Sequence, residues 1–190
     1  MGPSSPVAFV DPRTIVLLTG VMGGLMAVVL FFLRRNYPAS VRGLSHWAGG
    51  TALLFMAGLT AATRGILPDL FGISVANLLI FSGVYLQYFG SQHFFGLKPR
   101  FWPRYAVIVA MTLLSTWFLV ADPQYRVRLM ISTVVLAWLF SAHARLIHVH
   151  GVRSFAYRMA IAVLVCSFLS QVLRLATAWL LPLGTGILDN

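Results

Sequence analysis

Residues 71–97 read FGISVANLLIFSGVYLQYFGSQHFFGL, a long stretch without a single Asp, Glu, Lys or Arg. An α-helix needs about 20 predominantly apolar residues to cross the roughly 30 Å hydrocarbon core of a bilayer. The stretch is longer than that, and it lacks the alternation of polar and apolar residues that marks the ~10-residue strands of a membrane β-barrel. Because a helix satisfies its backbone hydrogen bonds within one segment, the stretch predicts a transmembrane helix.

Further apolar segments lie on both sides of this stretch, separated by short polar links with Pro and Gly as breakers. The predicted fold class is all-α: a polytopic membrane protein, a bundle of about six transmembrane helices that forms a single domain over residues 1–190. Because the links are short, successive helices should be antiparallel neighbours. The expected helices cover about residues 14–33, 47–67, 71–97, 105–121, 127–144 and 155–183.

The composition agrees with a lipid environment. Of the 190 residues, 59% are hydrophobic and 9% are charged, whereas soluble domains have about 45–50% apolar and about 25% charged residues. The formal net charge of +10 raises the possibility of nucleic-acid binding. The basic residues, however, lie in the links between apolar runs, as they do in membrane proteins. We therefore expect the lipid bilayer as a partner and no nucleic acid.

The basic residues also predict an orientation. The links after the first, third and fifth expected helices carry nine of them and no acid, whereas all four aspartates lie on the opposite side. Links rich in Lys and Arg stay on the cytoplasmic side, so we expect the N-terminus outside, in a bacterial inner membrane. The nine residues are Arg34, Arg35, Arg42, Lys98, Arg100, Arg104, Arg145, Arg153 and Arg158.

No catalytic motif is recognisable. The chain lacks a GxxxxGK[ST] phosphate loop, a GxSxG elbow, an HExxH metal motif and any Glu. Its aspartates fall at helix ends or in the tails, whereas a proton-coupled pump usually places a carboxylate deep in a helix. We assign no catalytic residue, and whether the chain belongs to an enzyme stays open.

The last helix supplies the first candidate ligand site. Arg174 lies within it, together with Gln171 one turn earlier, and an ionisable residue inside a membrane helix suggests function by default. Arg174 could bind an anionic ligand such as a lipid or fatty-acid head group, and Arg64 is expected at a similar depth. The alternative is a structural salt bridge, or a side chain that snorkels to the membrane interface.

One face of the expected third helix supplies the second candidate. Polar and aromatic residues recur there at spacings of three and four, so they form one stripe. Since lipid offers no partner for hydroxyl and amide groups, the stripe should face protein. It could line a pocket that includes Tyr85 and Tyr88, or it could form hydrogen bonds between helices. Its members are Asn77, Phe81, Tyr85, Tyr88, Gln92 and Phe95.

Three histidines are weak candidates for a metal or haem site: His46, His93 and His143, all expected on the cytoplasmic side. The alternative is interfacial contact with head groups or loop carbonyls, and we expect neither haem nor metal as a cofactor. The pattern Gly20-x-x-x-Gly24 would let two helix backbones approach closely, within the bundle or across a homodimer.

Two stretches carry a resemblance to a known family. They are LFFLRRNYPASVRGLSHWAGG at 30–50 and GVYLQYFGSQHFFG at 83–96, the latter followed by a basic link. Through these, the chain resembles the N-terminal membrane regions of bacterial GGDEF-type diguanylate cyclases over about residues 10–185. In that family the membrane region senses or anchors, and a cytoplasmic GGDEF domain makes cyclic di-GMP from two GTP molecules as a dimer. This chain has no GGDEF motif, so no cyclase residue is carried over.

The resemblance implies a sensory or anchoring membrane domain of a signalling protein, with a small-molecule or lipid ligand and a homodimer as expected partners. Six crossings would leave the C-terminus outside, so a cytoplasmic output domain would need a seventh helix, and we expect the chain to be the front part of a longer protein. Two alternatives remain open. A small transporter or permease subunit predicts internal symmetry and broken helices, and a haem- or metal-binding redox protein predicts colour.

Overall fold

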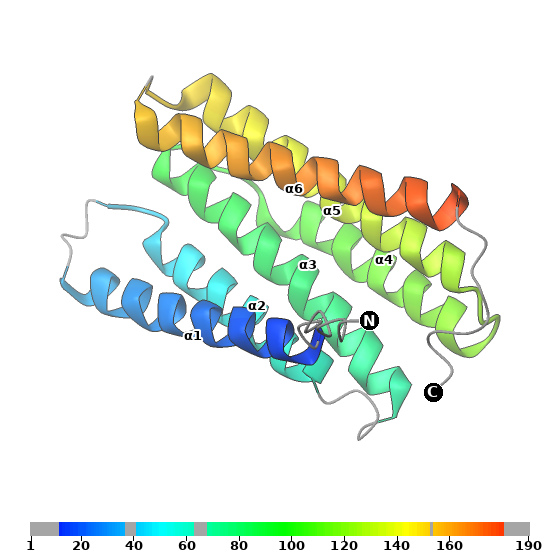
Figure 1. Cartoon of the computed structure of the whole chain (residues 1–190). Helices are drawn as coiled ribbons and strands as arrows, with labels where there is room; N and C mark the ends of the chain where they lie inside the picture. The colour runs from blue at the N-terminus through cyan, green and yellow to red at the C-terminus, as the bar shows by residue number, and fades with distance from the viewer. Residues whose placement is uncertain (1–11, 37–40, 63–67, 153, 181–190) are drawn as a thin grey trace, which may run out of the picture.

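The computed structural model describes residues 12–36, 41–62, 68–152 and 154–180. In these ranges the chain forms six α-helices and no strand (Figure 1). The all-α class predicted from the sequence is therefore confirmed. The helices are α1 (Pro12–Asn36), α2 (Leu44–Ala62), α3 (Asp69–Phe94), α4 (Phe101–Val120), α5 (Tyr125–His150) and α6 (Phe155–Leu180).

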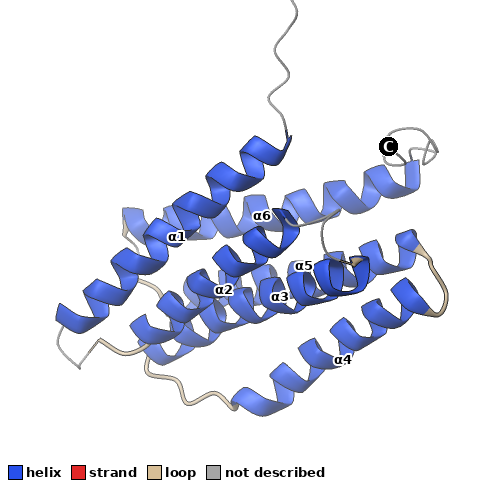
Figure 2. Cartoon of the chain, turned by 90° about the horizontal axis from the view of Figure 1, so that it is seen from below, coloured by secondary structure: helices blue, strands red, loops and turns tan. Residues whose placement is uncertain are grey.

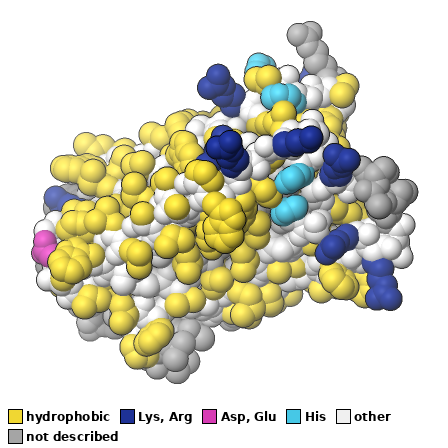
Figure 3. Space-filling view, turned by 180° about the vertical axis from the view of Figure 1, so that it is seen from behind, with side chains coloured by type: hydrophobic (Ala, Val, Ile, Leu, Met, Phe, Trp, Pro, Cys, Tyr) yellow, Lys and Arg dark blue, Asp and Glu magenta, His cyan; other side chains and the backbone are white. Residues whose placement is uncertain are grey.

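Four of the helices, α3 to α6, are long and apolar enough to cross a membrane. The molecular surface suits an apolar solvent, because large hydrophobic side chains cover much of it (Figure 3). Leu113, Trp117 and Leu173, for example, are each more than 60% exposed, and soluble monomers rarely expose large continuous apolar patches. That all six helices cross a membrane, and that the N-terminus lies outside, go beyond this finding and stay predictions.

The end of α5 differs from the prediction. The sequence predicts a polar link that contains Arg145, His148 and His150, but α5 continues through His150, where the Gly151 N–H donates to the Ile147 carbonyl at 2.8 Å. The prediction is wrong because it ends the helix where the apolar run ends. Basic side chains in a last turn interact favourably with the helix dipole, so they extend a helix beyond its apolar part.

The link between α3 and α4 lies a few residues earlier in the chain than predicted. α4 begins at Phe101, not at residue 105, and α3 ends at Phe94, before residue 97. Gly96 has φ +75°, a left-handed conformation that glycine adopts at low cost and that commonly ends a helix. The predicted last turns of the second and sixth helices, in residues 63–67 and 181–190, lie outside the described residues.

The core lies between α3, α4 and α5. Phe81 and Tyr85 of α3, Ile108 of α4 and Leu139 of α5 are fully buried in it. The Tyr85 hydroxyl donates to the Phe101 carbonyl at 2.9 Å, which ties α3 to the start of α4. The prediction that the polar and aromatic stripe of α3 faces protein is confirmed: its members Phe81, Tyr85, Tyr88 and Gln92 are buried, and Asn77 and Phe95 are partly buried.

The outer helices have few partners. Among the described helices, α1 packs against α2 alone and α6 packs against α5 alone. In Figure 2, α1 and α6 lie on one side of the layer formed by α2, α3 and α5, and α4 lies on the other side. Among the described helices, none packs against both α1 and α6.

Candidate functional site

The contact between α2 and α3 sets the position of the site. Glycines face each other in two antiparallel pairs, Gly43 with Gly90 and Gly50 with Gly83. A Cβ atom on Gly50 would lie 2.7 Å from the Gly83 carbonyl oxygen, and one on Gly83 would lie 2.8 Å from the Gly50 oxygen. Small residues of this kind allow membrane helices to pack backbone to backbone. Gly43 also has φ +92°, which glycine tolerates.

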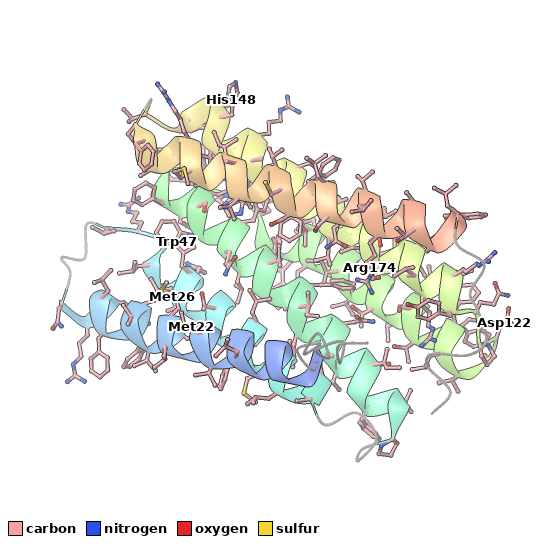
Figure 4. All side chains as sticks on the ribbon, viewed as in Figure 1. Met22, Met26, Trp47, Asp122, His148 and Arg174 are labelled. Atoms are coloured by element: carbon pink, nitrogen blue, oxygen red, sulfur yellow. The ribbon has the colours of Figure 1, made fainter. Side chains whose placement is uncertain are left out.

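This close approach places the Trp47 indole against α3 (Figure 4). The indole nitrogen lies 3.1 Å from the Gln87 carbonyl oxygen and 3.1 Å from the Ser91 hydroxyl oxygen, so its N–H can donate to either. One turn further along α2, the Thr51 hydroxyl donates to the Trp47 carbonyl at 2.9 Å, and the Gln87 amide donates to Thr51 at 3.5 Å.

His143 of α5 completes the network. Its Nε2 atom lies 2.8 Å from the Ser91 hydroxyl oxygen, and both side chains are buried. The Ser91 hydroxyl also lies within donating distance of the Gln87 carbonyl, at 3.0 Å. Ser91 therefore joins three helices, α2 through Trp47, α5 through His143 and its own α3. A buried network of this kind positions each side chain tightly, because an unpaired polar group in an apolar environment is costly.

A cleft of about 480 Å³ opens over this network. Its floor carries polar groups from α2, α3 and α5, and its walls come from α1 and α6. The volume falls within the usual range of ligand sites, about 300–1,000 Å³, which are mostly apolar with a few placed polar groups. The floor is lined by Trp47, Thr51, Gln87, Ser91, His143 and Ile147, and the walls by Leu30, Met159, Ala160, Val163 and Leu164.

The polar groups at the floor of the cleft can form hydrogen bonds to a ligand. Ser91 and His143 have the spacing of a nucleophile and a general base, but such a pair needs a third group that orients the imidazole. Among the described residues, no hydrogen-bond partner holds Nδ1 of His143. The floor instead offers hydrogen-bond donors and acceptors without any carboxylate, Lys or Arg.

Replacing Ser91 with alanine tests the network. We expect Ser91→Ala to lower the free energy of unfolding by about 1–3 kcal/mol, because the buried imidazole of His143 loses its partner. Ser170→Ala is the matched control, since the exposed Ser170 hydroxyl donates only to a carbonyl of its own helix. The control should change stability by less than about 0.5 kcal/mol. Equal effects in the two variants, measured by thermal unfolding in detergent, would contradict the network.

The structure does not bring the ligand residues proposed from sequence into one site. Arg174 and Gln171 lie on α6, which packs only against α5 among the described helices, whereas Tyr85 and Tyr88 lie on α3. Arg174 is exposed, and Figure 4 labels it on the middle part of the bundle. Gln171 has a buried amide oxygen without a hydrogen-bond partner. Arg64 lies outside the described residues.

The two tyrosines belong to the core and do not line the cleft. Tyr88 accepts a hydrogen bond from the Gln92 amide at 3.0 Å, and the Arg104 guanidinium lies 5.8 Å from the centroid of its ring. The hydrogen bond stays within α3, and the guanidinium contact joins α3 to α4.

The three histidines do not converge. The rings of His46 and His93 stack at 5.1 Å with 6° between their planes, whereas His143 bonds to Ser91. Among the described residues, no group of three or more His, Cys, Asp or Glu side chains could hold a metal ion.

Four residues of this site were not predicted from the sequence: Trp47, Thr51, Gln87 and Ser91. A usable signal was present: glycines recur seven residues apart at 43 and 50 and again at 83 and 90. Equal spacing in two consecutive segments, here α2 with the residue before it and α3, is what an antiparallel backbone contact requires. The pattern that the sequence analysis noticed, Gly20 and Gly24, faces α2 within the bundle, where a Cβ on Gly24 would lie 3.0 Å from Phe55.

Comparisons with known proteins give no relative. No family model matches the chain, and neither a curated protein nor a solved structure matches it.

Proposed function

We propose that this chain is the membrane-embedded sensory or anchoring domain of a bacterial signalling protein, and that its cleft binds a lipophilic ligand. The observation that carries the proposal is the cleft itself, which has apolar walls and a hydrogen-bonding floor centred on Ser91 and His143. The linked cytoplasmic diguanylate cyclase domain rests on the resemblance in residues 30–50 and 83–96 alone.

The chemistry of the cleft selects the ligand class. The floor presents one indole N–H, two hydroxyl groups, one amide and one imidazole, and it carries no acidic or permanently cationic group. A neutral or weakly polar head group with an oxygen acceptor or hydroxyl fits such a floor, and an acyl or isoprenoid chain fits the apolar walls. The ligand we propose is a lipid-like molecule with one neutral oxygenated head group, such as a fatty alcohol or a quinone.

The position of the walls supplies a route for a signal. α1 and α6 each pack against a single neighbouring helix, so a ligand between them can change their separation without disturbing the core of α3, α4 and α5. A ligand shifts such an equilibrium only if it binds the two arrangements with different affinities. The separation of α1 and α6 is therefore the quantity that the ligand should control.

We further propose that all six helices cross the inner membrane, with the N-terminus outside. Lys, Arg and His side chains gather at one end of the molecule (Figure 3), where α1, α3 and α5 end. This basic end would face the cytoplasm, because links rich in Lys and Arg stay on the cytoplasmic side of the membrane. Asp122 lies at the other end, near the right edge of Figure 4.

The function is tested by measuring the distance between α1 and α6. Spin labels on cysteines at Val29 and Ala162, both exposed and outside the cleft, are introduced with Cys166→Ser. We expect oleyl alcohol or decylubiquinone to shift the distance distribution, because both have an oxygenated head. Octadecane, which has none, should leave it unchanged. If neither oleyl alcohol nor decylubiquinone changed the distance between the two labels at saturation, sensing through this cleft would be refuted.

A further inference from the structure

A second cavity lies on the opposite side of α5, at the basic end of the bundle. Its volume is about 710 Å³, and α3, α4 and α5 line it. It shares no lining residue with the cleft described above. Its lining residues are Tyr88, Arg104, Trp138, Ser141, Ala142, Arg145, Leu146, Val149 and His150.

Two arginines from different helices border this cavity, Arg104 in the first turns of α4 and Arg145 near the end of α5. Neither forms an ion pair with a carboxylate among the described residues. The sequence offers few candidates, since it has no acid between residues 70 and 121 or between 123 and 188. Two uncompensated guanidinium groups at one cavity favour an anionic occupant.

The inner wall adds a hydrogen-bond donor. The Tyr88 hydroxyl oxygen accepts the Gln92 amide at 3.0 Å, so its own proton is free to be donated. The Tyr88 side chain is buried, and its ring lies 5.8 Å from the Arg104 guanidinium. This contact holds one arginine beside one donor. α5 also contributes apolar side chains to the lining, Trp138, Leu146 and Val149, beside the polar Ser141 and His150.

We propose that this cavity is a binding site for a phosphate ester group, held by Arg104 and Arg145. Guanidinium groups match phosphate oxygens in pairs of hydrogen bonds, and they are the preferred side chains for this anion. The Tyr88 hydroxyl supplies a further donor, and the exposed apolar side chains of Trp138 and Val149 fit the acyl part of a phospholipid. The same chemistry would hold a soluble phosphate ester. The site is independent of the lipophilic ligand proposed for the cleft.

The test compares two double variants of the full chain in detergent. Arg104→Gln with Arg145→Gln removes both guanidinium groups from the cavity. Arg100→Gln with Arg158→Gln removes the same charge from exposed positions at the same end, outside the cavity. Native mass spectrometry measures the binding of dioleoylphosphatidylglycerol and of zwitterionic dioleoylphosphatidylcholine, and inorganic phosphate is added as a competitor.

We expect phosphatidylglycerol to bind the first double variant about tenfold more weakly than it binds the control pair. Phosphatidylglycerol that persists in millimolar phosphate identifies a lipid head group as the ligand, and displacement by phosphate identifies a soluble phosphate ester. Equal affinities of the two double variants for phosphatidylglycerol, or a wild-type protein that binds neither lipid, would overturn the proposal.

A second measurement does not depend on the folding of the glutamine pair. Phosphatidylglycerol brominated on its acyl chains quenches nearby tryptophans, and Trp138 lines the cavity. At one lipid per protein, most of the quenching should disappear in Trp138→Phe and persist in Trp117→Phe, since Trp117 is exposed on α4 outside the cavity. Quenching that persists equally in both variants would place the lipid elsewhere.

Discussion

Gly83→Leu is expected to lower the free energy of unfolding by about 3 kcal/mol or more, because overpacking forces backbone shifts when no side chain can move aside. A Cβ atom at Gly83 would already lie 2.8 Å from the Gly50 carbonyl oxygen and 2.8 Å from Cγ of Leu54. The backbone oxygen cannot yield without separating α2 from α3. Denaturant titration in detergent, followed by tryptophan fluorescence, measures the change.

Gly72→Leu is the matched control on the same helix, because a Cβ at Gly72 would meet no atom of the described residues within 4 Å. It should be neutral or slightly stabilising, since leucine forms helices better than glycine by up to about 1 kcal/mol. Gly83→Leu should also remove the hydrogen bonds from Trp47 to α3 and with them the floor of the cleft. A Gly83→Leu protein as stable as Gly72→Leu would mean that α2 and α3 do not pack backbone to backbone.

Ala160→Trp is expected to weaken the binding of oleyl alcohol by about a hundredfold, equivalent to about 2.7 kcal/mol. Ala160 is a wall residue of the 480 Å³ cleft, so an indole there occupies the space of the ligand and covers Ser91. Stability should change little, because α6 has no buried residue whose packing the indole would displace. Binding is measured by native mass spectrometry across a titration.

Ala162→Trp provides the comparison, since Ala162 is exposed on the same helix and does not line the cleft. The two variants add the same side chain and differ only in the face of α6 that carries it. Oleyl alcohol should bind Ala162→Trp as tightly as the wild type. Loss of binding in both, or in neither, would show that the ligand does not enter between α1 and α6.

The helical fold follows from sequence features that depend on length and hydropathy alone. An uncharged run such as 71–97 has few stable forms in lipid, and α3 occupies most of it. Helix ends are less predictable, because polar residues such as Arg145 and His148 continue a helix beyond its apolar part. The stripe on α3 was also predictable, because residues at spacings of three and four share one face of a helix.

The candidate site was not predictable in the same way. Ser91, Trp47 and His143 come from three helices, and nothing local in the sequence says which helices touch. The residues that looked most functional, Arg174 and Gln171, attracted notice because charge is rare in membrane segments, yet they lie on α6, outside the cleft. Tertiary contact decides which polar residues share a site, and here the two glycine pairs set that contact between α2 and α3.

The cleft as the ligand site can be tested most directly by photolabelling. Oleyl alcohol with a diazirine in its chain is irradiated with the purified protein, and the labelled residues are mapped by mass spectrometry. We predict labels on Leu30 and on the α6 wall from Met159 to Leu164, reduced by excess unlabelled oleyl alcohol. Labels spread evenly over exposed apolar residues such as Leu113 and Leu173, without such competition, would contradict a ligand held between α1 and α6.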